Sequence, residues 1–151
     1  MSEPEAGALQ PIQLLLVDDD DVDVKLTLRA LASDRVINHV NVVHDGVEAM
    51  AYLRREGQYA NAVRPDLIFL DLNMPRMDGR EVLREIKADK DFGAIPVIVL
   101  TTSDADEDVV RSYKEHANSY ITKPIDMAQF RHAIRALEQY WFAVVKLPGK
   151  D

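Results

Sequence analysis

Polar residues follow four short apolar stretches of this 151-residue chain, each at the point where the stretch ends. They are the acidic run Asp18 to Asp21, the single Asp71, the hydroxyl run Thr101 to Ser103, and Lys123. Carboxylates gathered in one place repel each other, and a bound divalent cation relieves that repulsion. Oxygen ligands without histidine or cysteine favour Mg²⁺, which keeps part of its water shell and accepts phosphate oxygens. These residue types therefore indicate phosphoryl transfer assisted by Mg²⁺.

The same chemistry gives each group a part in the reaction. Asp19, Asp71 and a nearby backbone carbonyl would hold the ion and leave room for a phosphoryl oxygen. A carboxylate would attack the phosphorus in line, while charge spreads over the other phosphoryl oxygens. The ammonium group of Lys123 and the hydroxyl of Thr101 would each stabilise one of those oxygens.

The apolar stretches themselves are typical of strands in a parallel sheet. Leu14 to Val17, Leu67 to Leu70 and Val97 to Leu100 are continuously apolar, as expected for strands covered on both faces. Weaker runs from Val40 to Val43 and from Ser119 to Thr122 supply two more strands. The segments between the runs have helical spacing, so the pattern predicts β-α repeated five times, with helices on both faces of the sheet. The functional crevice of such a sheet lies beyond the carboxyl ends of its strands.

Three apolar stripes predict helices that pack on this sheet. The stripes are Val24, Leu28 and Leu31; Val47, Met50 and Leu53; and Val82, Leu83 and Ile86. Asp45 with Glu48 three residues later predicts a capping box at the start of the second helix. The longest loop is expected from Glu56 to Pro65, and the second pair of the acidic run, Asp20 and Asp21, is expected to form only the negative first turn of a helix.

Composition limits the class of protein. The hydrophobic fraction of 47% supports one core, and the net charge of -8 argues against nucleic acid or an anionic membrane as a direct partner. There is no cysteine, and no apolar run has the length of a membrane span. We expect a disordered lead over residues 1–11, one domain over 12–145, a tail over 146–151, and a cytoplasmic location.

Four motifs together resemble the receiver domain of response regulators in two-component signalling. They are VDD after the first strand, LDLNMPRMDG around Asp71, VLTTSD at the fourth strand and YITKP at the fifth. The resemblance runs from about Leu14 to Val144. It implies a flavodoxin-like (βα)5 doubly wound parallel sheet with strand order 2-1-3-4-5.

The resemblance also implies a role for individual residues. Asp71 is similar to the phospho-acceptor, and Asp18, Asp19 and Asp71 to the carboxylates that hold Mg²⁺, together with the backbone carbonyl of Asn73. Thr101, Thr102 and Lys123 are similar to the residues that bind the phosphoryl group. Thr101 and Tyr120 resemble the hydroxyl and the aromatic ring that switch together after phosphorylation.

Two other classes of function remain open from the residues alone. An Mg²⁺-dependent aspartyl-phosphate hydrolase would use the same nucleophile, but its usual second aspartate is replaced here by Asn73, which cannot transfer a proton. A passive interaction module would not need the complete set of acidic, hydroxyl and lysine residues. The preferred hypothesis is a single-domain receiver that catalyses its own phosphorylation and dephosphorylation, without turning over a separate substrate.

The resemblance extends to partners. The segment from Asp45 to Leu83, with the long loop from Glu56 to Pro65, is similar to the small regulators paired with phytochrome-type histidine kinases. A kinase of that type, a bacteriophytochrome, is therefore the expected phosphoryl donor.

The fifth helix suggests a second partner. Its apolar stripe comprises Met127, Phe130, Ile134, Leu137, Trp141 and Val144. Because Tyr140, Trp141 and Phe142 are consecutive, they cannot all face one core, so some aromatic surface should point outward near Val145 and Leu147. We therefore predict a symmetric homodimer built from the fifth helix and the C-terminal tail.

Overall fold

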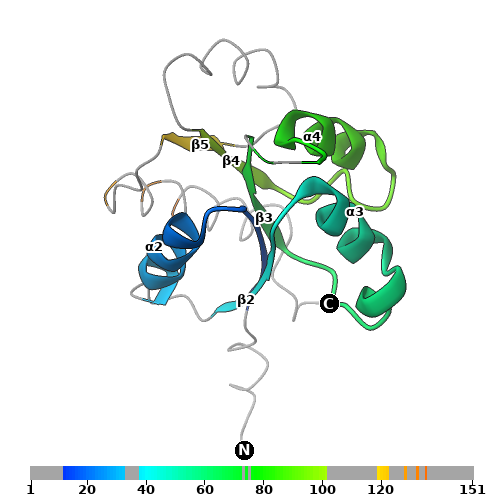
Figure 1. Ribbon diagram of the computed structural model, residues 1–151, viewed down its shortest axis with the longest axis horizontal. Helices are drawn as coiled ribbons and strands as arrows, with labels where there is room; N and C mark the ends of the chain where they lie inside the picture. Colours follow the sequence, from blue (N-terminus) through cyan, green and yellow to red (C-terminus); the bar gives the residue numbers. More distant parts are fainter. Residues whose placement is uncertain are drawn as a thin grey trace, which may run out of the picture.

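The computed structural model shows a five-stranded parallel sheet with helices on both faces (Figure 1). The structure describes residues 12–32, 38–72, 74, 76–101, 119–122, 128, 132 and 135. The strands lie in the order β2-β1-β3-β4-β5, so both the predicted fold class and the predicted strand order are confirmed. The expected lead over 1–11 and tail over 146–151 lie outside the described residues.

All five strands lie where the apolar runs predicted them. They are β1 (Ile12–Val17), β2 (Asn38–Val43), β3 (Leu67–Asp71), β4 (Val97–Thr101) and β5 (Ser119–Thr122). Asp71 is the last residue of β3, and in the parallel register Val17 pairs with Leu70. Asp18, one residue past β1, therefore lies level with Asp71 at the same edge of the sheet.

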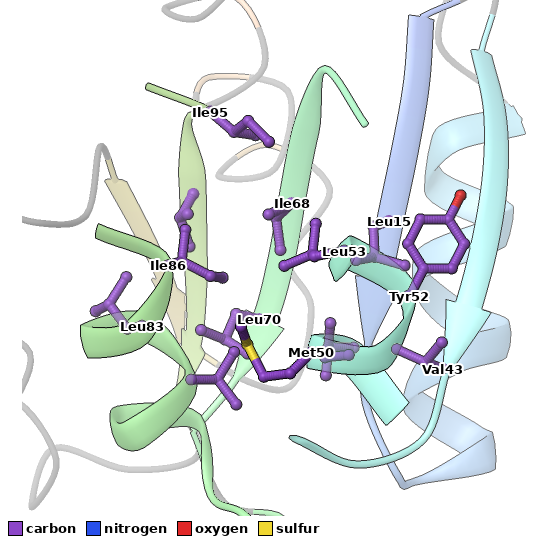
Figure 2. Packing of buried hydrophobic residues seen from close by; sticks show 14 of the residues in the cluster. Leu15, Val43, Met50, Tyr52, Leu53, Ile68, Leu70, Leu83, Ile86 and Ile95 are labelled. Atoms are coloured by element: carbon purple, nitrogen blue, oxygen red, sulfur yellow. The ribbon is translucent and has the colours of Figure 1, made fainter. Parts of the chain in front are cut away.

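Alternate strand residues supply two apolar layers, one on each face of the sheet. Helix α2 (Asp21–Ala32) packs on one face, with Phe69 at the centre of its layer. Helices α3 (Gly46–Arg54) and α4 (Gly79–Ala88) cover the other face side by side (Figure 1). Figure 2 shows side chains of α3 and α4 meeting those of the central strands in this second layer, among them Met50, Leu53, Leu83, Ile86, Ile68 and Leu70. The site residues of β1 and β3 are thus held from both sides.

One of the three predicted helical stripes is partly wrong. Val47 is 45% exposed, whereas the buried positions of α3 include Gly46, Ala49, Met50 and Leu53. These four residues have the i, i+3, i+4, i+7 spacing of one helical face, and Val47 lies outside it. The stripe was misjudged because small residues, rather than the apolar valine, face the interior at the start of the helix.

The predicted cap of α3 by Asp45 is confirmed, but the return bond from Glu48 reaches the His44 amide and not the Asp45 amide of a capping box. The Asp45 side chain accepts a hydrogen bond from the Glu48 amide at 2.9 Å, and the Glu48 carboxylate accepts one from the His44 amide at 2.9 Å. The predicted long loop contains a single 3-10 turn, η1 (Gly57–Tyr59).

The predicted fourth helix lies outside the described residues. In the fifth helical segment Ala128, His132 and Arg135 are helical and exposed, which places one face of that segment in solvent. Within the part of the chain that the structure describes, no helix has the length and apolar character needed to cross a bilayer.

Candidate metal centre

Three carboxylates converge at the carboxyl edge of the sheet. Asp18 and Asp19 follow β1, Asp71 ends β3, and one oxygen of each lies within 4.8 Å of the others. Asp18 is 0% exposed and Asp71 2% exposed, while Asp19 is open to solvent. Asp18, Asp19 and Asp71 therefore lie together, as the sequence predicted.

Backbone hydrogen bonds fix the two buried members. The Asp18 amide donates to the Val43 carbonyl at 3.1 Å, and the Asp18 carboxylate accepts from the Asp20 amide at 3.0 Å. On the β3 side, the amide of Leu72, the residue after Asp71, donates to the Leu100 carbonyl at 3.1 Å. The carboxylates are therefore anchored by the sheet and its first turns.

Asp20 has a structural role, as its place in the acidic run indicated. Its side chain accepts from the amides of Val22 at 2.9 Å and Asp23 at 3.2 Å, at the start of α2. An aspartate in this position caps a helix and complements the helix dipole. Only the first two residues of the acidic run belong to the cluster.

The donor set fits a hard divalent cation. All three ligating groups are carboxylate oxygens, which Mg²⁺ and Mn²⁺ accept readily. In a six-coordinate site with ligands at about 2.1 Å, neighbouring ligands are about 3 Å apart and opposite ligands about 4 Å apart. The carboxylate oxygens, all within 4.8 Å of one another, are therefore placed where a single ion can contact all three residues.

The loop between β3 and α4 is tied to the start of α3. The Arg76 guanidinium contacts one oxygen of Asp45 through Nε at 2.8 Å and through Nη2 at 2.6 Å. Arg76 has a φ of 65°, in the left-handed region that non-glycine residues seldom adopt. This ion pair was not predicted, because the two residues are 31 positions apart and the sequence marks Asp45 only as a helix cap.

The ionisation of Asp45 reflects these partners. Burial alone raises the pKa of this carboxyl group, but the Glu48 amide and the Arg76 guanidinium outweigh it and hold the pKa below its usual value. Asp45 is therefore charged at neutral pH and pairs with Arg76 as an ion.

The remaining predicted site residues are described incompletely. Asn73, Thr102 and Lys123 lie outside the described residues, and the structure gives only the backbone of Thr101 and Tyr120. Thr101 ends β4, next to β3 in the sheet, so its backbone position agrees with a place in the site. The roles assigned to these five residues stay predictions.

A model of the response regulator receiver domain matches residues 14–135. The chain belongs to the response regulator receiver family. Receivers take a phosphoryl group from a histidine kinase onto an aspartate, and their acidic pocket binds a divalent metal. The match is to a receiver, so the hydrolase hypothesis gains no support from it.

Similar receivers include two that are named as response regulators of a phytochrome or a bacteriophytochrome. Response regulator Rcp1 of Synechocystis sp. is 42% identical over 139 residues, which cover 92% of this chain and 95% of Rcp1. The Mn²⁺-bound structure of Rcp1 has a TM-score of 0.74, and the match covers 92% of this chain and 100% of that structure. The structure of the phosphorylated cyanobacterial phytochrome response regulator RcpA is 49% identical and has a TM-score of 0.74. The match covers 88% of this chain and 95% of RcpA. The bacteriophytochrome response regulator RtBRR is 41% identical and has a TM-score of 0.78. The match covers 85% of this chain and 78% of RtBRR.

Removing one charge from the cluster should stabilise the metal-free receiver and abolish its stabilisation by a metal ion. In metal-free buffer we expect Asp18→Asn to raise the free energy of unfolding by about 1 kcal/mol, because it relieves repulsion between buried carboxylates. Millimolar Mn²⁺ should stabilise the wild-type receiver but not this variant, since only the folded wild type binds the ion. Urea unfolding with and without Mn²⁺ measures both effects.

The matched control is Asp20→Asn, which keeps the cap of α2 and leaves the cluster intact. It should respond to Mn²⁺ like the wild type. Equal stabilisation of Asp18→Asn and the control by Mn²⁺ would place the ion elsewhere.

Proposed function

We propose that Asp71 accepts the phosphoryl group, in a receiver that acts as a single domain and signals through protein contacts. The observation that carries this proposal is the place of Asp71 at the end of β3, nearly buried and within 4.8 Å of Asp18 and Asp19. The single-domain mode of action is supported by the 95% of Rcp1 that the match covers.

Mg²⁺ is the proposed cofactor, held by Asp18, Asp19, Asp71 and the backbone carbonyl of Asn73. When bound, the ion neutralises charge on the carboxylates and on one oxygen of the incoming phosphoryl group. The carboxylate cluster supports the assignment, because it supplies only hard oxygen ligands.

The reaction then follows from the arrangement of the chain's own groups. A carboxylate oxygen of Asp71 attacks the phosphorus as the phosphorus–nitrogen bond of the donor histidine breaks in line with it. Lys123, Thr101 and Thr102 bind the phosphoryl oxygens and stabilise their charge. Since this machinery belongs to the receiver itself, the receiver also catalyses transfer from small phosphodonors and its own dephosphorylation.

The proposed response to phosphorylation passes through Thr101 and Tyr120. Their strands are neighbours, and the parallel register pairs Thr101 with Thr122 and Val99 with Tyr120. The backbones of the two residues are therefore offset by two positions on adjacent strands. In the proposal the Thr101 hydroxyl moves toward the phosphoryl group and the Tyr120 ring moves with it.

A phytochrome-type histidine kinase, a bacteriophytochrome, is the proposed donor. The similarity to the phytochrome response regulator RcpA and the bacteriophytochrome response regulator RtBRR supports this choice. Histidine kinases draw the phosphoryl group from ATP, so the proposal includes a cytoplasmic location.

An apolar pair beside the acidic cluster offers a contact for the donor. Val22 is 66% exposed and Leu26 is 37% exposed, one helical turn apart on α2, which begins two residues after Asp19. In this proposal a phosphohistidine approaches Asp71 past this end of α2. The two exposed apolar side chains would then contact the kinase.

The acceptor is tested by phosphorylation with acetyl phosphate and Mg²⁺. We expect the wild type to take up one phosphoryl group per chain, and Asp71→Asn to take up none, because the amide nitrogen and oxygen cannot form the acyl phosphate. Intact-mass spectrometry counts the groups. Uptake by Asp71→Asn at the wild-type rate contradicts the assignment, and repeated release of phosphate without a labelled receiver would indicate a hydrolase.

The donor contact is tested by comparing phosphoryl transfer from the kinase with phosphoryl transfer from acetyl phosphate. Leu26→Glu should slow transfer from an autophosphorylated bacteriophytochrome kinase of the same genome about tenfold, because a charge replaces an apolar contact at the interface. Labelling by acetyl phosphate should be unchanged. Val63→Glu is the control, since Val63 is 52% exposed in the loop before β3. Equal kinase transfer rates for both variants would exclude the α2 contact.

A homodimer through the fifth helix and the C-terminal tail is the last part of the proposal, and it rests on the aromatic run Tyr140 to Phe142 in the sequence. The segment lies outside the described residues. Light scattering over a micromolar concentration range should show the wild type as a dimer and Phe142→Glu as a monomer, because the glutamate would place a charge in the contact. A wild type that stays monomeric at all concentrations excludes the dimer.

A further inference from the structure

The loop that follows Asp71 is held in place from the side of α3. Its far end closes on β3 through the Gly79 amide, which donates to the Leu72 carbonyl at 3.0 Å. A Cβ atom on Gly79 would collide with the backbone of Asp71 and lie 2.6 Å from the Leu72 Cα, so this approach requires glycine. The loop therefore leaves and rejoins the end of β3 within a few residues.

The start of α3 lies directly against the middle of the same loop. A Cβ atom on Gly46 would collide with the Met77 carbonyl and lie 2.7 Å from the Met77 Cβ. Asp45, the residue before Gly46, receives the Arg76 guanidinium at 2.6 and 2.8 Å. Arg76 and Met77 are adjacent, so a charged contact and a close packing contact act on the same point of the loop.

The backbone of Arg76 adopts a conformation that the residue itself disfavours. Its φ of 65° is natural for glycine and costs a non-glycine residue energy. The Asp45 carboxylate is 11% exposed and already caps α3, so it is a fixed partner and not a mobile surface charge. An arginine in a strained conformation, paired with a nearly buried aspartate, suggests a positioning role.

We propose that the Asp45–Arg76 pair positions the loop after Asp71, and through it the metal ligands at the end of β3. This inference rests on the proposed function of Asp71 and the neighbouring Asn73 carbonyl. Arg76 touches neither the ion nor the phosphoryl group in this proposal; it fixes the loop that begins at the ligand Asp71. A supporting partner of this kind orients the residues that coordinate a metal.

Two substitutions remove the pair without removing other features. Arg76→Gly abolishes the ion pair but suits the positive φ, so the thermal midpoint should stay equal or rise. Asp45→Asn keeps a side chain that caps α3 but removes the charge. Each should weaken Mg²⁺ binding about tenfold, measured by calorimetric titration, and slow labelling by acetyl phosphate at fixed Mg²⁺.

The control is Arg54→Ala, which breaks an ion pair between α3 and α4. Arg54 contacts Glu85 at 2.9 Å, away from the loop, and its loss should leave Mg²⁺ affinity unchanged. The double variant Asp45→Asn/Arg76→Gly should bind Mg²⁺ no more weakly than either single variant, because both remove one interaction.

The outcomes distinguish a failure of the positioning role from a failure of the proposed role of Asp71. Wild-type Mg²⁺ affinity in Arg76→Gly or in Asp45→Asn overturns the inference. A weakened affinity also overturns it if the thermal midpoint falls by more than about 5 °C, because that fall indicates a general loss of stability. If Asp71 proves not to be the acceptor, labelling by acetyl phosphate no longer reports on this loop. The Mg²⁺ titration still tests the positioning role.

Discussion

Two carboxylates buried side by side impose the main constraint on this fold. Asp18 and Asp71 are almost fully buried, with oxygens within 4.8 Å of each other. Removing a charge from water costs on the order of several kcal/mol per ion, and two like charges at this distance add repulsion. The residues cannot move apart, because Val17 and Leu70 hold β1 and β3 in register just before them. A bound cation relieves this repulsion, and the exposed Asp19 gives the cluster a carboxylate in contact with solvent.

The rest of the structure keeps the carboxylates in that arrangement. Two apolar layers fix the sheet, and their largest fully buried side chain, Phe69, lies on β3 two residues before Asp71. Far from the site, the Lys87 ammonium donates to the carbonyls of Gly93 and Ile95 at 3.1 and 2.8 Å and so closes the turn into β4. Burial lowers the pKa of Lys87, but these carbonyls compensate part of that cost. A phosphoryl site that depends on positioning needs such rigidity behind it.

The strands and the acidic cluster could be predicted from sequence because their causes are local. A continuous apolar run indicates a doubly covered parallel strand, and a parallel sheet brings its carboxyl ends together without further information. The stripe of α3 was partly misjudged because Gly46 and Ala49 are buried through close packing, which residue type does not reveal. The Asp45–Arg76 pair could not be predicted, since it depends on a contact over 31 positions and on an arginine with positive φ.

The same pair resolves a conflict of charge at the site. An arginine in the loop after Asp71 is a monovalent counter-ion for the buried carboxylates, and a guanidinium lying between them would compete with a divalent metal. In the structure the Asp45 carboxylate engages both Nε and Nη2 of Arg76 and neutralises the guanidinium locally. The low pKa of Asp45 keeps this partner ionised at neutral pH. The loop therefore retains a positive residue as a tether, while the charge of the acidic cluster stays available to the cation and to the phosphoryl group it helps to bind.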